Sequence, residues 1–188
     1  MAAEAAAIVQ AAFDRRNGPG RALGGDAELI ALACRDMAVR FHRGGRLLVF
    51  GNGGAATDAQ HVAVEFMHPV VVGKRALPAM ALAAGDFAER VRLFGRPDDI
   101  ALGISAGGRC ANVLEALREA SGIGMETVAL LGGDGGDIAG SGAARHVLIA
   151  RSDDPCVVKE VHVTAYHILW ELVHVFFDQP GTLEGEAV

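Results

Sequence analysis

The sequence predicts a doubly wound α/β domain of three layers, built on a five-stranded parallel sheet. Short apolar runs bounded by glycine, proline or charged residues support this prediction, because strands buried on both faces have this pattern. Five such runs fall near residues 46–51, 78–83, 99–104, 126–131 and 145–150. Helical patterns separate them, and the right-handed crossover rule then makes the strands parallel.

Composition indicates one compact domain. The chain has 188 residues, 51% hydrophobic and 21% charged, and its net charge of −6 gives no support for direct nucleic-acid binding. Cys34, Cys110 and Cys156 share no metal-ligand spacing, which indicates reduced thiols. No segment has the length and apolarity of a bilayer span, and the first residues lack a basic n-region. We therefore expect a cytoplasmic protein with no membrane partner.

The elements outside the sheet are expected to be helices. An alanine-rich run over residues 2–16 predicts a first helix that GPGRALGG ends, and Asp26 can cap a second helix. Further helices are expected near residues 86–94, 109–120, 136–139 and 155–177. We divide the chain into an N-terminal helical arm at 1–25, a main domain at 26–178 and a flexible tail at 179–188.

Two glycine-rich corners follow predicted strands and lead into helices. The first is GNGGA at residues 51–55, and the second is GISAGGRCAN at residues 103–112. Free N–H groups and the dipole at a helix N-terminus favour an anion there. Turns between strands and helices also need glycine for geometry alone, so both interpretations stay open. Neither corner fits the dinucleotide fingerprint or the P-loop.

Ionisable residues recur at helical spacing on two predicted helices. His61 and Glu65 are four residues apart and share one helix face, as a base with its orienting partner or two metal ligands would. A solvated pair is the ordinary alternative. The last helix carries more such groups than packing requires, although an exposed polar face would also explain them: Lys159, Glu160, His162, His167 and His174.

Four motifs then occur in a familiar order: GNGGxxxDAQHVAVE, GISAGGxxxNV, TVALLGGDGGDIA and KEVHVTAYHILWELV. Together they resemble the sugar isomerase (SIS) domain and, within it, the phosphoheptose isomerases, which act on sedoheptulose 7-phosphate. The resemblance covers residues 26–175 approximately. It implies the SIS fold, a sugar-phosphate ligand, and a homotetramer with active sites at subunit interfaces.

The resemblance also implies roles for individual residues. Glu65 matches the family's catalytic glutamate, and His167 matches its acid/base partner. His61, Glu65 and His167 match the zinc ligands of members that bind zinc. Ser105 matches the first residue of the family's phosphate-binding cluster. With it, we expect other residues of the two corners and the last helix to bind the sugar phosphate: Asn52, Gly53, Gly54, Gly107, Arg109 and Lys159.

The chain departs from the family pattern in the phosphate loop. Ala55 stands where a serine is usual, and Ala106 and Gly107 remove two hydroxyl groups. Arg109 could bind phosphate instead, through its charge and its two-pronged geometry. The segment between the second and third predicted strands is also shorter than usual.

Lys159 occupies a zinc-ligand position that is usually glutamine. A protonated lysine cannot bind a metal, so we expect no metal cofactor, with zinc as the open alternative. If Lys159 points inward, its ammonium would pair with Glu65 and replace the charge of the metal. Otherwise it would pair with Glu160 or Asp153 near solvent.

Two functional classes follow from the resemblance. The first is an aldose–ketose isomerase of sedoheptulose 7-phosphate or a related sugar phosphate. The second is a non-catalytic SIS tetramer resembling the DnaA-initiator-associating proteins, which bind a partner protein. Those proteins tend to lose the glutamate and the final histidine, whereas Glu65 and His167 are both present here. We therefore expect the isomerase.

Overall fold

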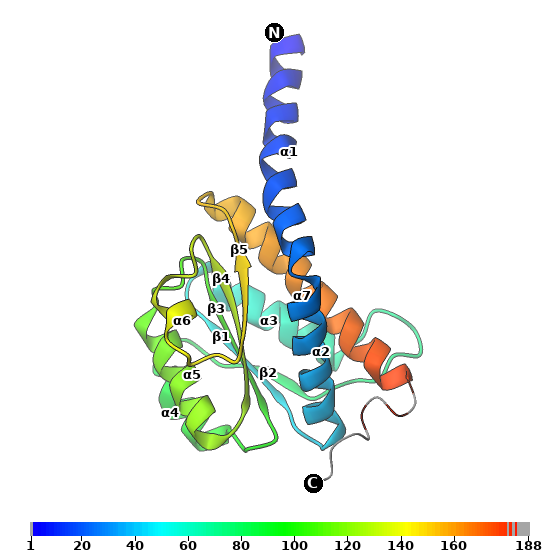
Figure 1. Ribbon diagram of the computed structural model, residues 1–188, viewed down its shortest axis with the longest axis vertical. Helices are drawn as coiled ribbons and strands as arrows, with labels where there is room; N and C mark the ends of the chain where they lie inside the picture. Colours follow the sequence, from blue (N-terminus) through cyan, green and yellow to red (C-terminus); the bar gives the residue numbers. More distant parts are fainter. Residues whose placement is uncertain (1, 180, 182, 184–188) are drawn as a thin grey trace.

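A five-stranded parallel sheet forms the centre of the protein (Figure 1), in a computed structural model that describes residues 2–179, 181 and 183. The strands lie in the order β2-β1-β3-β4-β5, and each neighbouring pair is parallel. The predicted strands and the doubly wound fold are confirmed. The strand bounds are β1 (Leu47–Gly51), β2 (Ala79–Ala81), β3 (Ile100–Ser105), β4 (Glu126–Gly132) and β5 (His146–Ala150).

Helices cover both faces of the sheet. One face packs against α2 (Ala27–His42), α3 (Gly54–Met67) and α7 (Pro155–Asp178). The other packs against α4 (Phe87–Phe94), α5 (Ala111–Ile123) and α6 (Gly136–Gly140). In β1, Leu47 and Val49 belong to the first core, and Leu48 and Phe50 to the second. This burial on both faces explains why the strands are continuous apolar runs.

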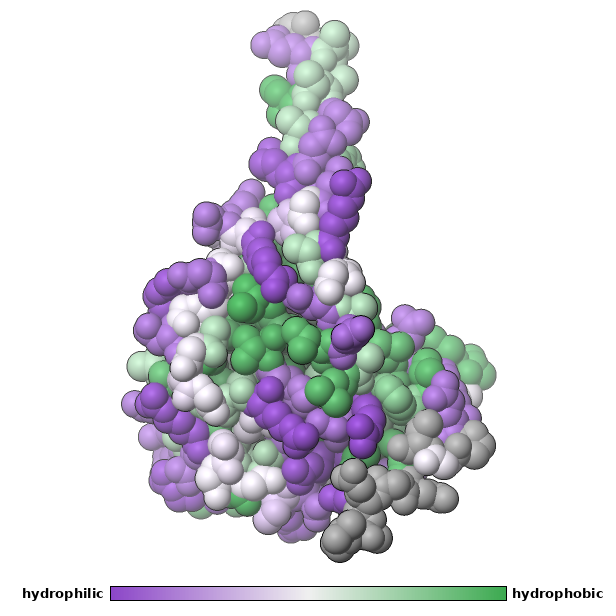
Figure 2. All heavy atoms as spheres, viewed as in Figure 1, coloured by the Kyte–Doolittle hydropathy of each residue, from purple (hydrophilic) through white to green (hydrophobic). Residues whose placement is uncertain are grey.

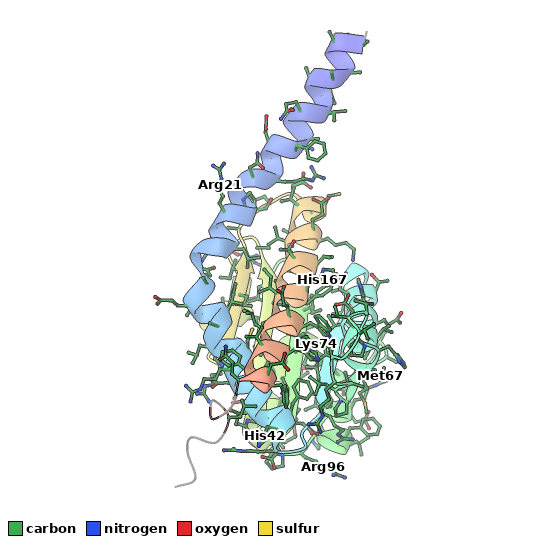
Figure 3. All side chains as sticks on the ribbon, turned by 90° about the vertical axis from the view of Figure 1, so that its right-hand side faces the viewer. Arg21, His42, Met67, Lys74, Arg96 and His167 are labelled. Carbon is green, nitrogen blue, oxygen red and sulfur yellow. The ribbon has the colours of Figure 1, made fainter. Side chains whose placement is uncertain are left out.

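The first helix is longer than predicted. Helix α1 (Ala2–Gly25) continues through Pro19, so its predicted end near residue 16 is wrong. Packing against α7 stabilises the second half, where the Arg16 Nε lies 2.6 Å from Glu160 Oε2 and Leu23 is buried. These contacts outweigh the hydrogen bond that proline cannot donate. The first half of α1 projects from the body, beyond the position of Arg21 (Figure 3).

Asp26 lies between α1 and α2 but does not cap α2 through its side chain, contrary to the prediction. Its carboxylate instead accepts hydrogen bonds from Arg151 Nη1 at 2.6 Å and Nη2 at 3.2 Å. A two-pronged bond to a charged guanidinium is stronger than one to a neutral backbone N–H, which explains the choice. The pair ties the start of α2 to the residue that follows β5.

The predicted flexible tail at 179–188 falls largely outside the described residues. Among the helices that are described, none combines the length and the apolarity needed to cross a membrane.

Gly108 provides a test of how the loops at the carboxyl end of the sheet pack. Its φ is +66°, and an added Cβ would overlap the carbonyl oxygen of Gly135. We expect Gly108→Ala to lower the free energy of unfolding by about 2 kcal/mol or more. At Gly107 an added Cβ would meet nothing within 4 Å, so Gly107→Ala should change the free energy of unfolding by less than about 0.5 kcal/mol. Urea denaturation measures both, and equal losses would contradict the loop packing described.

Candidate active site

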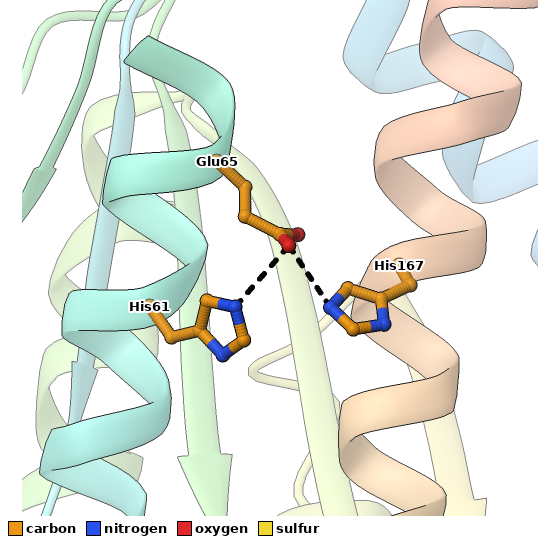
Figure 4. Close-up of side chains that lie close together, drawn as sticks. All are labelled: His61, Glu65 and His167. Atoms are coloured by element: carbon orange, nitrogen blue, oxygen red, sulfur yellow. Dashed lines mark ion pairs between the residues drawn. The ribbon is translucent and has the colours of Figure 1, made fainter. Parts of the chain in front are cut away.

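Glu65 lies between two histidines that come from neighbouring helices (Figure 4). Its Oε1 is 3.2 Å from Nε2 of His61, on the same helix α3, and 3.0 Å from Nε2 of His167 on α7. Glu65 has 17% of its side chain exposed, while His61 and His167 have 47% and 45%. The predicted His/Glu pair and the histidine of the last helix thus meet in one cluster, which opens to solvent through the two imidazole rings.

Tyr166 determines how the ring of His61 is held. Its phenolic oxygen lies 2.8 Å from Nδ1 of His61, and its ring packs edge-on against both histidines of the cluster. Burial raises the pKa of Tyr166, so the phenol stays protonated. Because the Glu65 carboxylate can only accept, a neutral His61 carries its proton on Nε2 and accepts from Tyr166 at Nδ1.

Trp170 fixes the backbone on the other side of the cluster. Its indole Nε1 donates to the carbonyl oxygen of Glu65 at 3.0 Å. A cavity of about 270 Å³ adjoins it, lined by Glu65, Val70, His167, Trp170 and Glu171. The lining of this cavity therefore combines a carboxylate and an imidazole with an indole and a valine.

The cluster fits a zinc ion by the chemistry of its donors. Two imidazole nitrogens and one carboxylate oxygen lie within 4.8 Å of one another. Catalytic zinc sites use such sets of three ligands and leave a fourth position open. The bond between His61 and Tyr166 also supplies the outer partner that zinc-binding histidines require.

Lys159 takes neither of its two predicted positions. Its Nζ lies 2.7 Å from Oδ1 of Asp58 and 3.1 Å from the carbonyl oxygen of Gly54. Glu65 is instead held by the histidines, and Glu160 pairs with Arg16. The physical reason is that α3 and α7 run parallel, so Lys159 meets the first turns of α3. A positive charge is therefore not placed against the His/Glu cluster.

A second cavity lies where the chain leaves β1 and β3 in opposite directions, the usual ligand position in an open α/β sheet. It measures about 370 Å³ and includes Asn52, Gly54, Ala106, Lys159 and His162 in its lining. Burial lowers the pKa of His162, so its ring is neutral near pH 7. Within the described residues its Nε2 has no hydrogen-bond partner.

The two glycine-rich corners are joined by a pair of amides. Asn52 Nδ2 donates to Asn112 Oδ1 at 2.8 Å, and Asn112 Nδ2 donates to Asn52 Oδ1 at 3.1 Å. Gly53, with φ +55°, precedes the first residue of α3. The two corners therefore lie next to each other at the carboxyl ends of β1 and β3.

The predicted phosphate loop is already internally paired. Arg109 Nη2 contacts both carboxylate oxygens of Asp134, at 2.9 and 2.7 Å, and this contact lowers the pKa of Asp134. Ser105 is buried, and its Oγ has no hydrogen-bond partner among residues that the structure describes. An anion at this loop would compete with Asp134 for Arg109. Anion binding here stays a prediction.

The corner and the His/Glu cluster occupy opposite ends of α3. Gly54 begins the helix and Glu65 lies in its last turns, about 16 Å further along the axis at 1.5 Å per residue. Within a single chain, the predicted phosphate-binding residues and the predicted catalytic residues thus form two separate places.

Sequence reasoning missed the contacts of Asp58, Asn112, Tyr166 and Trp170. All four side chains can form hydrogen bonds, but their partners are distant in the chain: Tyr166 and His61 are 105 residues apart, as are Trp170 and Glu65. The sequence offered one signal, at Asp58, where a carboxylate stands on the apolar face of a predicted helix; the side chain is 5% exposed. A buried carboxylate requires a charged partner.

Comparison with known proteins agrees with this architecture. The SIS domain family matches residues 21–132. The chain is 39% identical over 168 residues to the phosphoheptose isomerase of Solidesulfovibrio magneticus, which covers 81% of each chain. It is 40% identical over 169 residues to that of Chlorobium phaeobacteroides, covering 81% of this chain and 74% of the relative.

Two solved structures share the fold over nearly their whole length. A phosphoheptose isomerase from Francisella tularensis superposes with a TM-score of 0.81 at 27% identity, covering 91% of this chain and 98% of the other. The Neisseria gonorrhoeae enzyme gives 0.78 at 28% identity, with 88% and 96% covered. The chain therefore belongs to the SIS domain family. Within that family, its similarity is to the phosphoheptose isomerases.

Removing the hydroxyl of Tyr166 should release the ring of His61. We expect Tyr166→Phe to shift the ¹⁵N signal of His61 Nδ1 and to lower the free energy of unfolding by about 1 kcal/mol, the value of one hydrogen bond. NMR of ¹⁵N-histidine-labelled protein and urea denaturation measure the two effects. Thr164→Val is the control, because it removes a hydroxyl from α7 that bonds only within that helix. A His61 signal unchanged in Tyr166→Phe would rule out the assigned contact.

Proposed function

We propose that the protein is an aldose–ketose isomerase of a sugar phosphate, with sedoheptulose 7-phosphate as the substrate. The observation that supports this most directly is the Glu65 carboxylate between the Nε2 atoms of His61 and His167. Isomerisation between neighbouring carbons needs a carboxylate base and a second group that moves a hydroxyl proton. The relatives at 39% and 40% identity are named for the same chemistry.

In this proposal Glu65 removes the proton from C1 of the ketose, and the electron pair forms an enediol across C1 and C2. The same carboxylic acid then returns the proton to C2, which leaves the carbonyl at C1. His167 moves the accompanying hydroxyl proton between O1 and O2. No atom is gained or lost, because the reaction only relocates two hydrogens.

The ring nitrogens of His61 and His167 both contact Oε1 of Glu65, so Oε2 is the oxygen that would take the C1 proton in this proposal. Trp170 and Val70 line the adjoining cavity and offer it apolar surface. A zinc ion, if bound, would be held by His61, Glu65 and His167, and it would polarise the substrate carbonyl.

The phosphate group is proposed to bind at the other end of α3. Candidate contacts are the residues predicted from the sequence: Asn52, Gly53, Gly54, Ser105, Gly107, Arg109 and Lys159. Lys159 and Arg109 each contact a carboxylate, Asp58 and Asp134. Binding of phosphate would therefore exchange a carboxylate partner for a phosphoryl partner.

A homo-oligomer, most simply a tetramer, completes the proposal. The cluster and the phosphate residues of one chain are about 16 Å apart along α3, so one substrate would be bound by groups from two copies. Helix α1 also exposes Ile8, Val9 and Phe13, at 67%, 55% and 64%. Figure 2 shows apolar residues on the face of the body below this arm, which a second copy could cover.

The compartment in this proposal is the cytoplasm, as the three scattered cysteines led us to expect. The scaffold alternative is not favoured. Its relatives tend to lose the catalytic pair, whereas Glu65 and His167 are in contact here, 3.0 Å apart.

Replacing the proposed base should abolish turnover without abolishing binding. We expect Glu65→Gln to reduce isomerisation of sedoheptulose 7-phosphate by a factor of about 10²–10⁴, the usual contribution of a positioned base. Exchange of the C1 hydrogen with solvent deuterium should fall in parallel, as NMR would show, while calorimetry detects binding. Glu171→Gln is the matched control, because it removes a carboxylate from the same cavity. Full activity in Glu65→Gln would refute the assignment.

A charge on the arm should disrupt the proposed oligomer. We expect Phe13→Glu to shift the protein to a smaller assembly in light scattering at micromolar concentration, because burying a carboxylate in an apolar contact is costly. Ala7→Glu adds the same charge on the other side of the helix and should leave the assembly intact. A wild-type monomer would contradict the proposal from the start.

A further inference from the structure

A cavity of about 330 Å³ lies outside the candidate active site, beside α2 at the amino ends of β4 and β5. Arginine dominates its lining, which consists of Leu32, Arg35, Asp36, Val39, Arg40, Arg43 and Arg145. The candidate active site uses α3 and α7 and the carboxyl ends of the strands, so this cavity is a separate place in the fold.

Two of the arginines contact carboxylates that are 2% and 12% exposed, those of Glu126 and Asp36. Arg40 Nη2 lies 3.5 Å from Oε2 of Glu126, and Arg145 Nη2 lies 3.3 Å from Oδ2 of Asp36. Arg40 Nη1 also donates to the carbonyl oxygens of Pro97 at 2.6 Å and Gly124 at 3.3 Å, and Arg145 Nη1 lies 3.5 Å from Oε2 of Glu126. A guanidinium group has five N–H donors, so both arginines keep donors for another acceptor.

The same carboxylates belong to a group with the spacing of a cation site, because Asp36, Glu126 and His146 bring ligand atoms within 4.8 Å of one another. The charge balance argues against it. Burial opposes ionisation of Glu126, yet His146, Arg145 and Arg40 together keep its pKa below the usual value. Two guanidinium groups already neutralise the two carboxylates, so a divalent cation would meet repulsion with no charge to compensate it.

Within the part of the chain that the structure describes, the side chains of Arg35 and Arg43 form no hydrogen bond or ion pair, and Arg43 bonds only through its backbone N–H, to the carbonyl oxygen of Val39. Arg35 lies on α2 and Arg43 caps its carboxyl end, eight residues later, which places them on one side, about two turns from each other. Four guanidinium groups face two carboxylates in this cavity, an excess of two positive charges. The chain as a whole carries a net charge of −6, so this is a local concentration of positive charge.

We propose that this cavity is a second anion site, which binds the phosphoryl dianion of a small metabolite or free phosphate. Arg35, Arg43 and Arg145, whose side chain is 62% exposed, would approach the anion from solvent, while Arg40, at 19%, lies behind it. Planar guanidinium groups match phosphoryl oxygens in geometry as well as in charge. The volume is at the lower end of small-molecule sites, and Leu32 and Val39 offer a short apolar contact to a bound metabolite.

The cavity and the candidate active site are connected through two helices that pack together. Helix α2 packs along α7, the helix that carries His167. The proposal does not depend on the isomerase activity, however, since it concerns binding alone.

The test is a titration of the full chain, labelled with ¹⁵N, with inorganic phosphate and separately with glycerol 3-phosphate, at constant ionic strength. Backbone signals of α2 and of residues near 145 should shift in a saturable way, apart from any shifts at 51–55 and 103–109. A stronger response to glycerol 3-phosphate would identify a metabolite as the ligand, and an equal response would identify phosphate. In Arg35→Ala/Arg43→Ala the affinity at α2 should fall by at least about tenfold, as expected for lost charged hydrogen bonds.

Arg21→Ala/Arg118→Ala is the matched control, because it removes two exposed arginines elsewhere and changes the net charge equally. It should leave the α2 titration unchanged. An equal loss of affinity in the control would mean that the effect comes from the net charge of the protein alone, and it would overturn the proposal. Absence of any α2 shift at about 10 mM phosphate would also overturn it. So would an unchanged α2 titration in Arg35→Ala/Arg43→Ala, whether or not light scattering showed an altered assembly.

Discussion

Helices α3 and α7 lie side by side and run in the same direction, and polar contacts set their register. From the amino ends onward, an ammonium pairs with a carboxylate, a phenol with an imidazole, an imidazole with a carboxylate, and an indole with a backbone carbonyl. These contacts are Lys159–Asp58 at 2.7 Å, Tyr166–His61 at 2.8 Å, His167–Glu65 at 3.0 Å and Trp170–Glu65 at 3.0 Å. A slip of one turn would place unlike partners opposite each other and leave a buried carboxylate unpaired.

This register has a direct consequence for function. It brings Glu65 between two imidazoles, and it also keeps the ammonium of Lys159 at the start of α3, where Asp58 is buried. The ammonium therefore does not contact Glu65, which was one of the two positions that sequence reasoning left open. The cluster retains the donor set of a metal site or of an acid/base pair, while Lys159 belongs to the region of the glycine-rich corners.

Three buried polar atoms make no hydrogen bond within the described residues: Ser105 Oγ, His162 Nε2 and Glu126 Oε1. Ser105 and His162 lie near the carboxyl end of the sheet, whereas Glu126 begins β4 at the amino end, where its Oε1 still faces His146 Nε2 at 3.4 Å. Also at the amino end, Asp99 accepts from the backbone N–H groups of Arg46 and Arg96 and from the Arg46 guanidinium, at 2.8, 3.1 and 3.0 Å. A fully bonded carboxylate stabilises the fold, whereas unsatisfied polar atoms are more often found where a ligand binds.

The sequence by itself determined the strands, the order of the layers and the types of residue at the site, because these follow from local periodicity and short motifs. It did not determine where α1 ends, which partner Asp26 takes, or which carboxylate Lys159 meets. Those outcomes depend on contacts between segments more than 100 residues apart, such as Arg16 with Glu160 and Lys159 with Asp58. Only the tertiary structure decided them: the packing of α7 against α1 and α3 selects the partners of Arg16 and Lys159, and the position of Arg151 after β5 selects that of Asp26.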